Sequence, residues 1–225
     1  MTLARRAVAE ALGTGLLVAA VVGSGIMGER LAGGNMGLAL LANTAATGAA
    51  LAALISTFGS VSGAHFNPIV TLAERVGGAL SWQDVPAYVA AQLIGGLLGT
   101  VVANLMFEGP IVSLSRHVRS GSAQLLSEVV ATFGLILIIG TCGRYRPGAV
   151  PLAVATYISA AYWFTASTSF ANPAVTLARA VSDSFAGIRP VDVPAFVVAQ
   201  AIGGALAVVV VRWLTPPDPD TSDAR

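Results

Sequence analysis

Six long apolar stretches run through this chain of 225 residues and constrain its fold more than any other feature. A helix that crosses a lipid bilayer needs about 20 mostly apolar residues. The segments that meet this requirement are approximately 7–27, 36–56, 84–106, 124–142, 149–168 and 194–214. Only 10% of the residues are charged, against roughly 25% in an ordinary soluble domain. The sequence therefore predicts an all-α membrane protein with six transmembrane helices.

The charged and reactive residues argue against several other classes of protein. The formal net charge is only +1, and a nucleic-acid partner would require a clustered basic face. Histidine, cysteine and acidic residues show no metal-ligand spacing, and no nucleophile is paired with a base. We therefore expect no metal, no cofactor, no nucleic-acid partner and no enzymatic activity.

The dipeptide Asn-Pro occurs twice between the apolar stretches, at Asn67-Pro68 and Asn172-Pro173. Asparagine is a favoured N-cap and proline is favoured at the first helical position, so each copy predicts the start of a helix. Each predicted helix, Pro68 to Gly77 and Pro173 to Ser182, has about ten residues, or roughly 15 Å, half of a hydrocarbon core of roughly 30 Å.

An internal repeat relates the two Asn-Pro motifs, which lie 105 residues apart (172 − 67). The other matching segments are Glu10-x-x-x-Thr14 with Glu128-x-x-x-Thr132, Asp84-Val85-Pro86-Ala87 with Asp192-Val193-Pro194-Ala195, and Ala91-Gln92 with Ala199-Gln200. Three spans in each unit would insert the second unit upside down relative to the first. Two half-helices would then meet at the midplane with their N-termini facing, where broken backbone is tolerated only inside protein or beside a water-filled path. This arrangement predicts a pore.

The predicted organisation is a channel domain over residues 1–214, followed by a disordered tail over 215–225. Repeat one covers about 1–107 and repeat two about 123–214. With both termini in the cytoplasm, seven of the twelve arginines would lie inside and five outside, which favours that orientation by a narrow margin.

Up to about Leu214 the chain resembles the aquaporin and aquaglyceroporin family, on its paired Asn-Pro motifs and repeated Glu and Gln positions. The resemblance implies six tilted spans plus two half-helices, usually assembled as a homotetramer with one pore in each subunit. Two positions differ from the family pattern: Ile69 replaces the usual alanine, and Val175 replaces the usual arginine after Asn172-Pro173-Ala174. The Asn-Pro-Ala-Val form resembles bacterial aquaglyceroporin-like channels associated with arsenic resistance, which implies a bacterial inner membrane.

The chemistry of the two asparagines follows from their place at helix starts. Each side-chain carbonyl of Asn67 and Asn172 can cap its own half-helix and leave its amide N–H groups facing the lumen. Each helix N-terminus carries roughly half a positive charge. The midplane should therefore repel cations and donate hydrogen bonds to solute oxygens.

Glu10 and Glu128 are ionisable residues inside apolar spans, where such groups are costly and usually face inward. In the resembled family, a glutamate here accepts hydrogen bonds from backbone N–H groups of the re-entrant loop. A proton-relay role is the alternative.

Family spacing locates four residues of a selectivity filter: Thr47, Ala160, Ser169 and Val175. Water-selective members place an arginine, a histidine and an aromatic ring in the filter, and all three are missing from these positions. An arginine would add a fixed charge and five donors. Its absence implies a wider and less polar ring.

Two residues are predicted to line the vestibules. His65 should lie in the approach to the first half-helix, with a pH gate as the alternative to an ordinary lining role. Arg179 lies one helical turn beyond Val175, which would place it at the outer mouth, with pairing to Asp183 or extension to the interface as the alternatives.

Together these features predict a passive channel for small uncharged solutes. Glycerol-sized polyols, neutral metalloid hydroxides such as arsenite, and water are the expected solutes. One alternative is a general water or glycerol facilitator without a metalloid role. Another is a poorly conducting membrane scaffold, because the bulky Ile69 could narrow the midplane.

Overall fold

A computed structural model describes residues 1–216, so most of the predicted tail, residues 217–225, lies outside the described part. Within residues 1–216 the chain is helical throughout and forms no strand. The elements are α1 (Leu3–Leu31), α2 (Met36–Ser62), α3 (Pro68–Gly77), α4 (Val85–Met106), α5 (Ser122–Tyr145), η1 (Pro147–Ala149), α6 (Val150–Phe164), α7 (Pro173–Arg179), η2 (Pro190–Asp192) and α8 (Val193–Leu214). The prediction of an all-α membrane fold is confirmed.

Each predicted span coincides with a helix, although α1 and α2 extend beyond the predicted ends and the fifth span is shorter than predicted. Among residues 1–216, α1, α2, α4, α5 and the helix that ends at Leu214 are long and apolar enough to cross a bilayer. The fifth predicted span, 149–168, forms a helix only over Val150–Phe164, which is 15 residues long. The chain then enters a loop that leads to α7, so the predicted end of this span was wrong.

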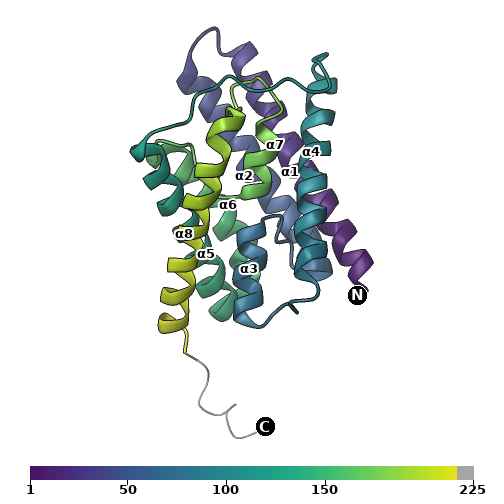
Figure 1. Cartoon of the computed structure of the whole chain (residues 1–225), viewed down its shortest axis with the longest axis vertical. Coiled ribbons are helices and arrows are strands. Elements are labelled where there is room, and N and C mark those ends of the chain that lie inside the picture. The colour runs from purple at the N-terminus through teal and green to yellow at the C-terminus, as the bar shows by residue number, and fades with distance from the viewer. Residues whose placement is uncertain (217–225) are drawn as a thin grey trace, which may run out of the picture.

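The two halves of the chain pack as an inverted pair. In the first half α1 packs on α2 and α4, and in the second half α5 packs on α6 and α8. The half-helices α3 and α7 lie one above the other, with their Asn-Pro ends meeting near the middle of the molecule (Figure 1). We call the end that carries the N-terminus and the end of α8 the inner end, and the opposite end the outer end.

Glycines allow the long helices to approach closely. A Cβ atom on Gly95 would collide with the backbone of Ala11, and one on Gly203 would collide with the backbone of Val129. The repeated Gly-Gly pairs therefore allow α4 to press against α1, and α8 against α5, as small residues do in membrane helix packing.

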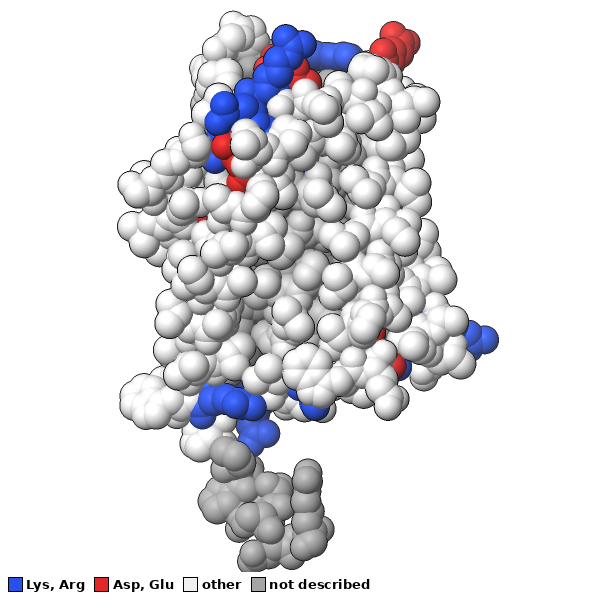
Figure 2. Space-filling view, viewed as in Figure 1, with Lys and Arg blue, Asp and Glu red and all other residues white. Residues whose placement is uncertain are grey.

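Charged side chains gather at the two ends of the molecule, and the surface between them is uncharged on the face shown in Figure 2. Charged groups are costly within hydrocarbon, so this belt is the part of the surface suited to face lipid. The long axis of the molecule then runs across the bilayer.

The second half-helix is shorter than the sequence predicted. The expected helix from Pro173 to Ser182 ends at Arg179. The next carbonyls, those of Ala180 and Val181, accept hydrogen bonds from backbone N–H groups of the outer loop, at 3.0 and 3.1 Å. These contacts with residues 107–121 end α7 after seven residues.

Candidate pore and selectivity filter

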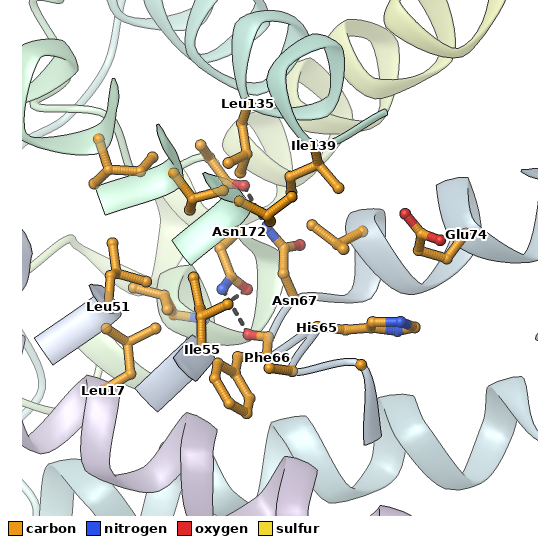
Figure 3. Close-up of a pocket in the computed structure, with 18 of the residues that line it drawn as sticks. Leu17, Leu51, Ile55, His65, Phe66, Asn67, Glu74, Leu135, Ile139 and Asn172 are labelled. Carbon is orange, nitrogen blue, oxygen red and sulfur yellow. Dashed lines mark hydrogen bonds between the residues drawn. The ribbon is translucent and has the colours of Figure 1, made fainter. Parts of the chain in front are cut away.

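Asn67 and Asn172 cap the two half-helices and connect them. The Oδ1 atom of Asn67 accepts from the N–H of Ile69 at 2.9 Å, and that of Asn172 accepts from Ala174 at 2.9 Å. The Nδ2 of Asn67 donates to the carbonyl of Ala171 at 2.7 Å, and the Nδ2 of Asn172 donates to the carbonyl of Phe66 at 2.8 Å (Figure 3). Each amide has a second N–H, so each motif can still offer a donor to the cavity.

Glu10 holds the first re-entrant loop from within the helix bundle. Its carboxylate accepts from the backbone N–H groups of His65 at 2.9 Å and Phe66 at 2.7 Å. The side chains of Ser62 and Gln92 donate to the same carboxylate, at 2.6 and 2.8 Å. Since Glu10 is fully buried, these four bonds provide the compensation that a buried charge requires.

Glu128 holds the second loop in the same way. It accepts from the backbone N–H groups of Phe170 at 2.9 Å and Ala171 at 2.8 Å, and from the side chain of Gln200 at 2.7 Å. Glu10 and Glu128 thus each bind the backbone of one re-entrant loop.

The supported loops have matching backbone conformations that side chains rarely adopt. Phe66 and Ala171, directly before the two Asn-Pro motifs, have φ angles of 50° and 49°. Left-handed conformations cost non-glycine residues about 1–3 kcal/mol each and persist where the surroundings impose them. Here the glutamate bonds impose them, and the strained loops bring their carbonyls to the asparagine amides.

A cavity of about 430 Å³ follows the half-helices from the inner end to Arg179. In Figure 3, Asn67 and Asn172 lie at its centre, between Leu51 and Ile55 on one side and Ile139 on the other. On each of five helices, the residues that line the cavity are four positions apart and so share one face of the helix. These residues are Thr47, Leu51 and Ile55; Leu135, Ile139 and Gly143; Val150, Val154, Ile158 and Tyr162; Val70 and Glu74; Val175 and Arg179. The pore thus has polar groups at the half-helices and apolar walls around them.

Three of the four predicted filter residues line this cavity: Thr47, Ser169 and Val175. The fourth, Ala160, does not, and it is exposed on the outer face of α6. Tyr162 lines the cavity instead, and its hydroxyl donates to Oγ1 of Thr47 at 3.2 Å. Side chains two positions apart on a helix point in directions about 200° apart. Ala160, two positions before Tyr162, therefore points away from the cavity.

Ser169 presents a polar atom to the cavity. Its Oγ is buried and has no hydrogen-bond partner within residues 1–216. A buried hydroxyl without a partner costs free energy, and a passing solute or water can supply the missing bond.

Ile69 is absent from the cavity lining, although the sequence raised the possibility that it narrows the midplane. It is buried against α8, where a Cβ on Gly204 would collide with its side chain. Gly204 makes room for the larger residue, so the Ile69 side chain fills space between helices and not in the pore.

Arg179 is buried, with 2% of its surface exposed, and lines the outer part of the cavity. Its guanidinium carbon lies 3.4 Å from the ring centroid of Phe170, and its Nε donates to the carbonyl of Ala186. Asp183 is bonded to Arg116 at 3.3 Å. Neither of the alternatives, pairing with Asp183 or extension to the interface, describes Arg179.

Arg119, in the outer loop, is a residue that sequence reasoning missed. It donates to the carbonyls of Gly187 at 2.8 Å and Ser167 at 3.0 Å, and it lies over the Phe170 ring at 4.8 Å. Burial lowers the pKa of its guanidinium to about 10, which leaves it charged at neutral pH. A single arginine in a loop gives no sequence signal for this role, since its partners are backbone carbonyls distant in sequence.

His65 and Glu74 line the cavity on its inner side (Figure 3). The Nδ1 of His65 lies 3.1 Å from Oγ1 of Thr71, and its ring centroid lies 5.2 Å from that of Tyr88. His65 is therefore held by α3 and α4 at the edge of the inner vestibule. Glu74 gives that vestibule a negative group, whereas Arg179 gives the outer part a positive one.

Two half-helices that meet through paired asparagines, beside a cavity lined by residues of α1 to α7, are the geometry of a transmembrane channel. The sequence matches the major intrinsic protein family in two segments, residues 1–148 and 146–224. The chain belongs to this family. Membership of the major intrinsic proteins identifies it as a membrane channel and not as an enzyme.

Several members of the major intrinsic protein family are similar over almost the whole chain. The aquaglyceroporin AqpS of Rhizobium meliloti (strain 1021) is 55% identical over 215 residues, which cover 96% of this chain and 92% of AqpS. A probable glycerol uptake facilitator protein of Thermotoga maritima is 30% identical over 92% of this chain and 97% of that protein. The X-ray structure of the aquaglyceroporin from Plasmodium falciparum superposes with a TM-score of 0.71 at 20% identity, over 96% of this chain and 98% of that one, which shows a shared fold.

Proposed function

We propose that this chain is a passive channel for small uncharged solutes, namely glycerol-sized polyols, neutral trivalent metalloid hydroxides such as arsenite, and water. The observation that carries the proposal is the lining of the filter by Val175, at the position where an arginine is usual in the family. An apolar side chain there leaves room for solutes larger than water. Relatives named as an aquaglyceroporin and as glycerol uptake facilitators support the same solute class.

The cavity is lined by both polar and apolar groups, which suits a polyol or a metalloid hydroxide. Hydroxyls of Thr47, Tyr162 and Ser169 lie on its lining, and the asparagine amides lie at its centre. Val175 and Leu51 provide apolar wall. A solute with several hydroxyl groups on a small frame can exchange its hydration shell for these groups while its apolar part contacts the wall.

The charges along the pore oppose the passage of cations and protons. The N-termini of α3 and α7 each present roughly half a positive charge at the midplane, and Arg179 adds a full charge near the outer end. Cations are repelled at both places. The asparagine donors also orient a passing water so that its hydrogens point away from the midplane, which opposes a proton wire.

The assembly and location follow from the same proposal. We expect a homotetramer with one pore in each subunit, in the inner membrane of a bacterium, with both termini in the cytoplasm. The uncharged belt of Figure 2 and the long apolar helices support a bilayer location.

The test is transport by the purified full chain in proteoliposomes. Glycerol and arsenite uptake should both exceed that of empty vesicles, sodium uptake should not, and Val175→Trp, which places a large ring in the filter, should block both solutes. Glycerol uptake without arsenite uptake would favour a water and glycerol facilitator. No uptake of either solute or of water would favour a scaffold.

A further inference from the structure

A second hollow, of about 870 Å³, lies at the inner end between α3, α5 and α8. We call it the inner groove. Its apolar part is formed by Val70, Ile136, Ile139, Val208 and Val211. Its volume falls within the range of roughly 300–1,000 Å³ that holds drug-sized ligands, so it is large enough for a sizeable apolar group.

Two arginines, Arg144 of α5 and Arg212 of α8, also line the inner groove. Both are exposed and lie in the last turns of their helices. The Nη2 of Arg212 donates to the carbonyl of Val76 at 2.8 Å, which anchors this side chain beside the end of α3. The guanidinium keeps further donors beyond that bond.

The order of these groups along the molecule matches a phospholipid. Arginines gather at the inner edge of the face seen in Figure 2, and the surface above them carries no charged side chain up to the outer end. Trp213, next to Arg212, is 79% exposed, and exposed tryptophans favour the depth of lipid headgroups. The groove therefore has its cationic end at headgroup depth and its apolar part at the depth of acyl chains.

The groove also adjoins the pore. Val70, Glu74, Ala79, Ile139 and Gly143 line both the groove and the main cavity. At Gly143 an added Cβ would have no atom within 4 Å. The groove and the inner vestibule thus share open space beside Gly143, which an acyl chain in the groove would fill.

We propose that the inner groove binds one anionic phospholipid, with its phosphate between Arg144 and Arg212 and an acyl chain along Val208 and Val211. Arginine pairs readily with phosphate through two parallel hydrogen bonds. The nearby carboxylate of Glu74 lies at the junction with the pore and would keep the phosphate at the arginine end. This lipid site is independent of which solute the channel conducts.

The test measures lipid binding to the detergent-solubilised full chain by native mass spectrometry. Phosphatidylglycerol should bind more tightly than phosphatidylcholine with the same chains. Arg144→Gln and Arg212→Gln should each weaken phosphatidylglycerol binding by about fivefold, the effect of roughly one basic residue near a membrane surface. Arg5→Gln, an exposed arginine at the same end, is the matched control and should leave binding unchanged.

Two further measurements separate this site from other occupants. Gly143→Leu, which fills the junction with the pore, should weaken both lipids, and excess inorganic phosphate should not displace phosphatidylglycerol. The chain shortened after Pro216 should keep the arginine effect, because lipid and not the acidic tail would be the partner. Equal binding of the two lipids, equal effects of Arg5→Gln and Arg212→Gln, or loss of the arginine effect in the shortened chain would each overturn the proposal.

Discussion

The guanidinium of Arg179 lies over the ring of Phe170, with its carbon 3.4 Å from the ring centroid. This contact keeps a positive charge inside the outer part of the pore although the usual filter arginine is replaced by Val175. The charge stands one helical turn from the filter position. It can therefore repel cations without occupying the position of Val175.

Removing this charge should increase cation leak. Arg179→Met preserves most of the packing on Phe170 but removes the charge, so conductance to sodium in planar bilayers should rise by about tenfold, which corresponds to only about 1.4 kcal/mol of barrier. Glycerol uptake should change little. Arg116→Met is the matched control, because Arg116 pairs with Asp183 outside the cavity. Unchanged conductance in Arg179→Met would leave the half-helix dipoles as the cation barrier.

Restoring the usual arginine should make the filter selective by size. Val175→Arg introduces a long side chain with five donors beside Thr47 and Tyr162. Uptake of glycerol and arsenite should fall by about tenfold, about 1.4 kcal/mol of barrier, while osmotic water permeability falls less. An equal loss for all three solutes would show that position 175 does not select by size.

The carboxylate of Glu128 should be essential for stability. Glu128→Gln keeps the shape but can accept with only one oxygen, so a buried donor among Phe170, Ala171 and Gln200 loses its partner, at a cost of about 1–3 kcal/mol. The unfolding temperature in detergent should fall clearly. Glu29→Gln is the control, since Glu29 makes one exposed bond of 3.2 Å to the N–H of Phe185. Equal shifts for the two variants would contradict a special role for Glu128.

Mercurial reagents should leave conduction largely intact. Cys142, the only cysteine of the chain, lies in the last turns of α5 and does not line the main cavity. Water permeability of proteoliposomes should therefore be similar before and after treatment. Strong inhibition that disappears in Cys142→Ser would mean that this end of α5 faces the conducting path.

The outer loop should give the channel a pH-dependent stability through His117. Burial, followed by the charges of Arg119 and Arg179, lowers the pKa of His117. Below about pH 6.5, the usual value, the unfolded chain then binds more protons than the folded chain, so the free energy of unfolding should fall as the pH drops. In His117→Gln, the unfolding temperature should depend less on pH between about pH 7 and 5 than it does in the unaltered protein. An unchanged slope would mean that His117 does not contribute.

The sequence alone was enough to predict the all-α membrane fold and the two half-helices. The length of an apolar stretch indicates directly that it can cross a membrane. The dipeptide Asn-Pro indicates the start of a helix, because asparagine caps it and proline suits its first position. Both signals need only neighbouring residues, as Asn67 with Pro68 and Asn172 with Pro173 illustrate. The internal repeat, with three spans in each unit, then predicts that the second half is inverted relative to the first.

Only the tertiary structure decided which side chains share the pore. The sequence pointed to Ala160, whereas Tyr162 reaches Thr47, because the register of a helix after a loop depends on packing. It gave no indication that Arg119 and Arg179 meet at Phe170, or that Ile69 lies against Gly204. Local patterns determine where helices begin and how long they are. Contacts between residues distant in sequence, such as Thr47 with Tyr162 or Ile69 with Gly204, depend on how the helices pack, and these contacts determine which side chains line the pore.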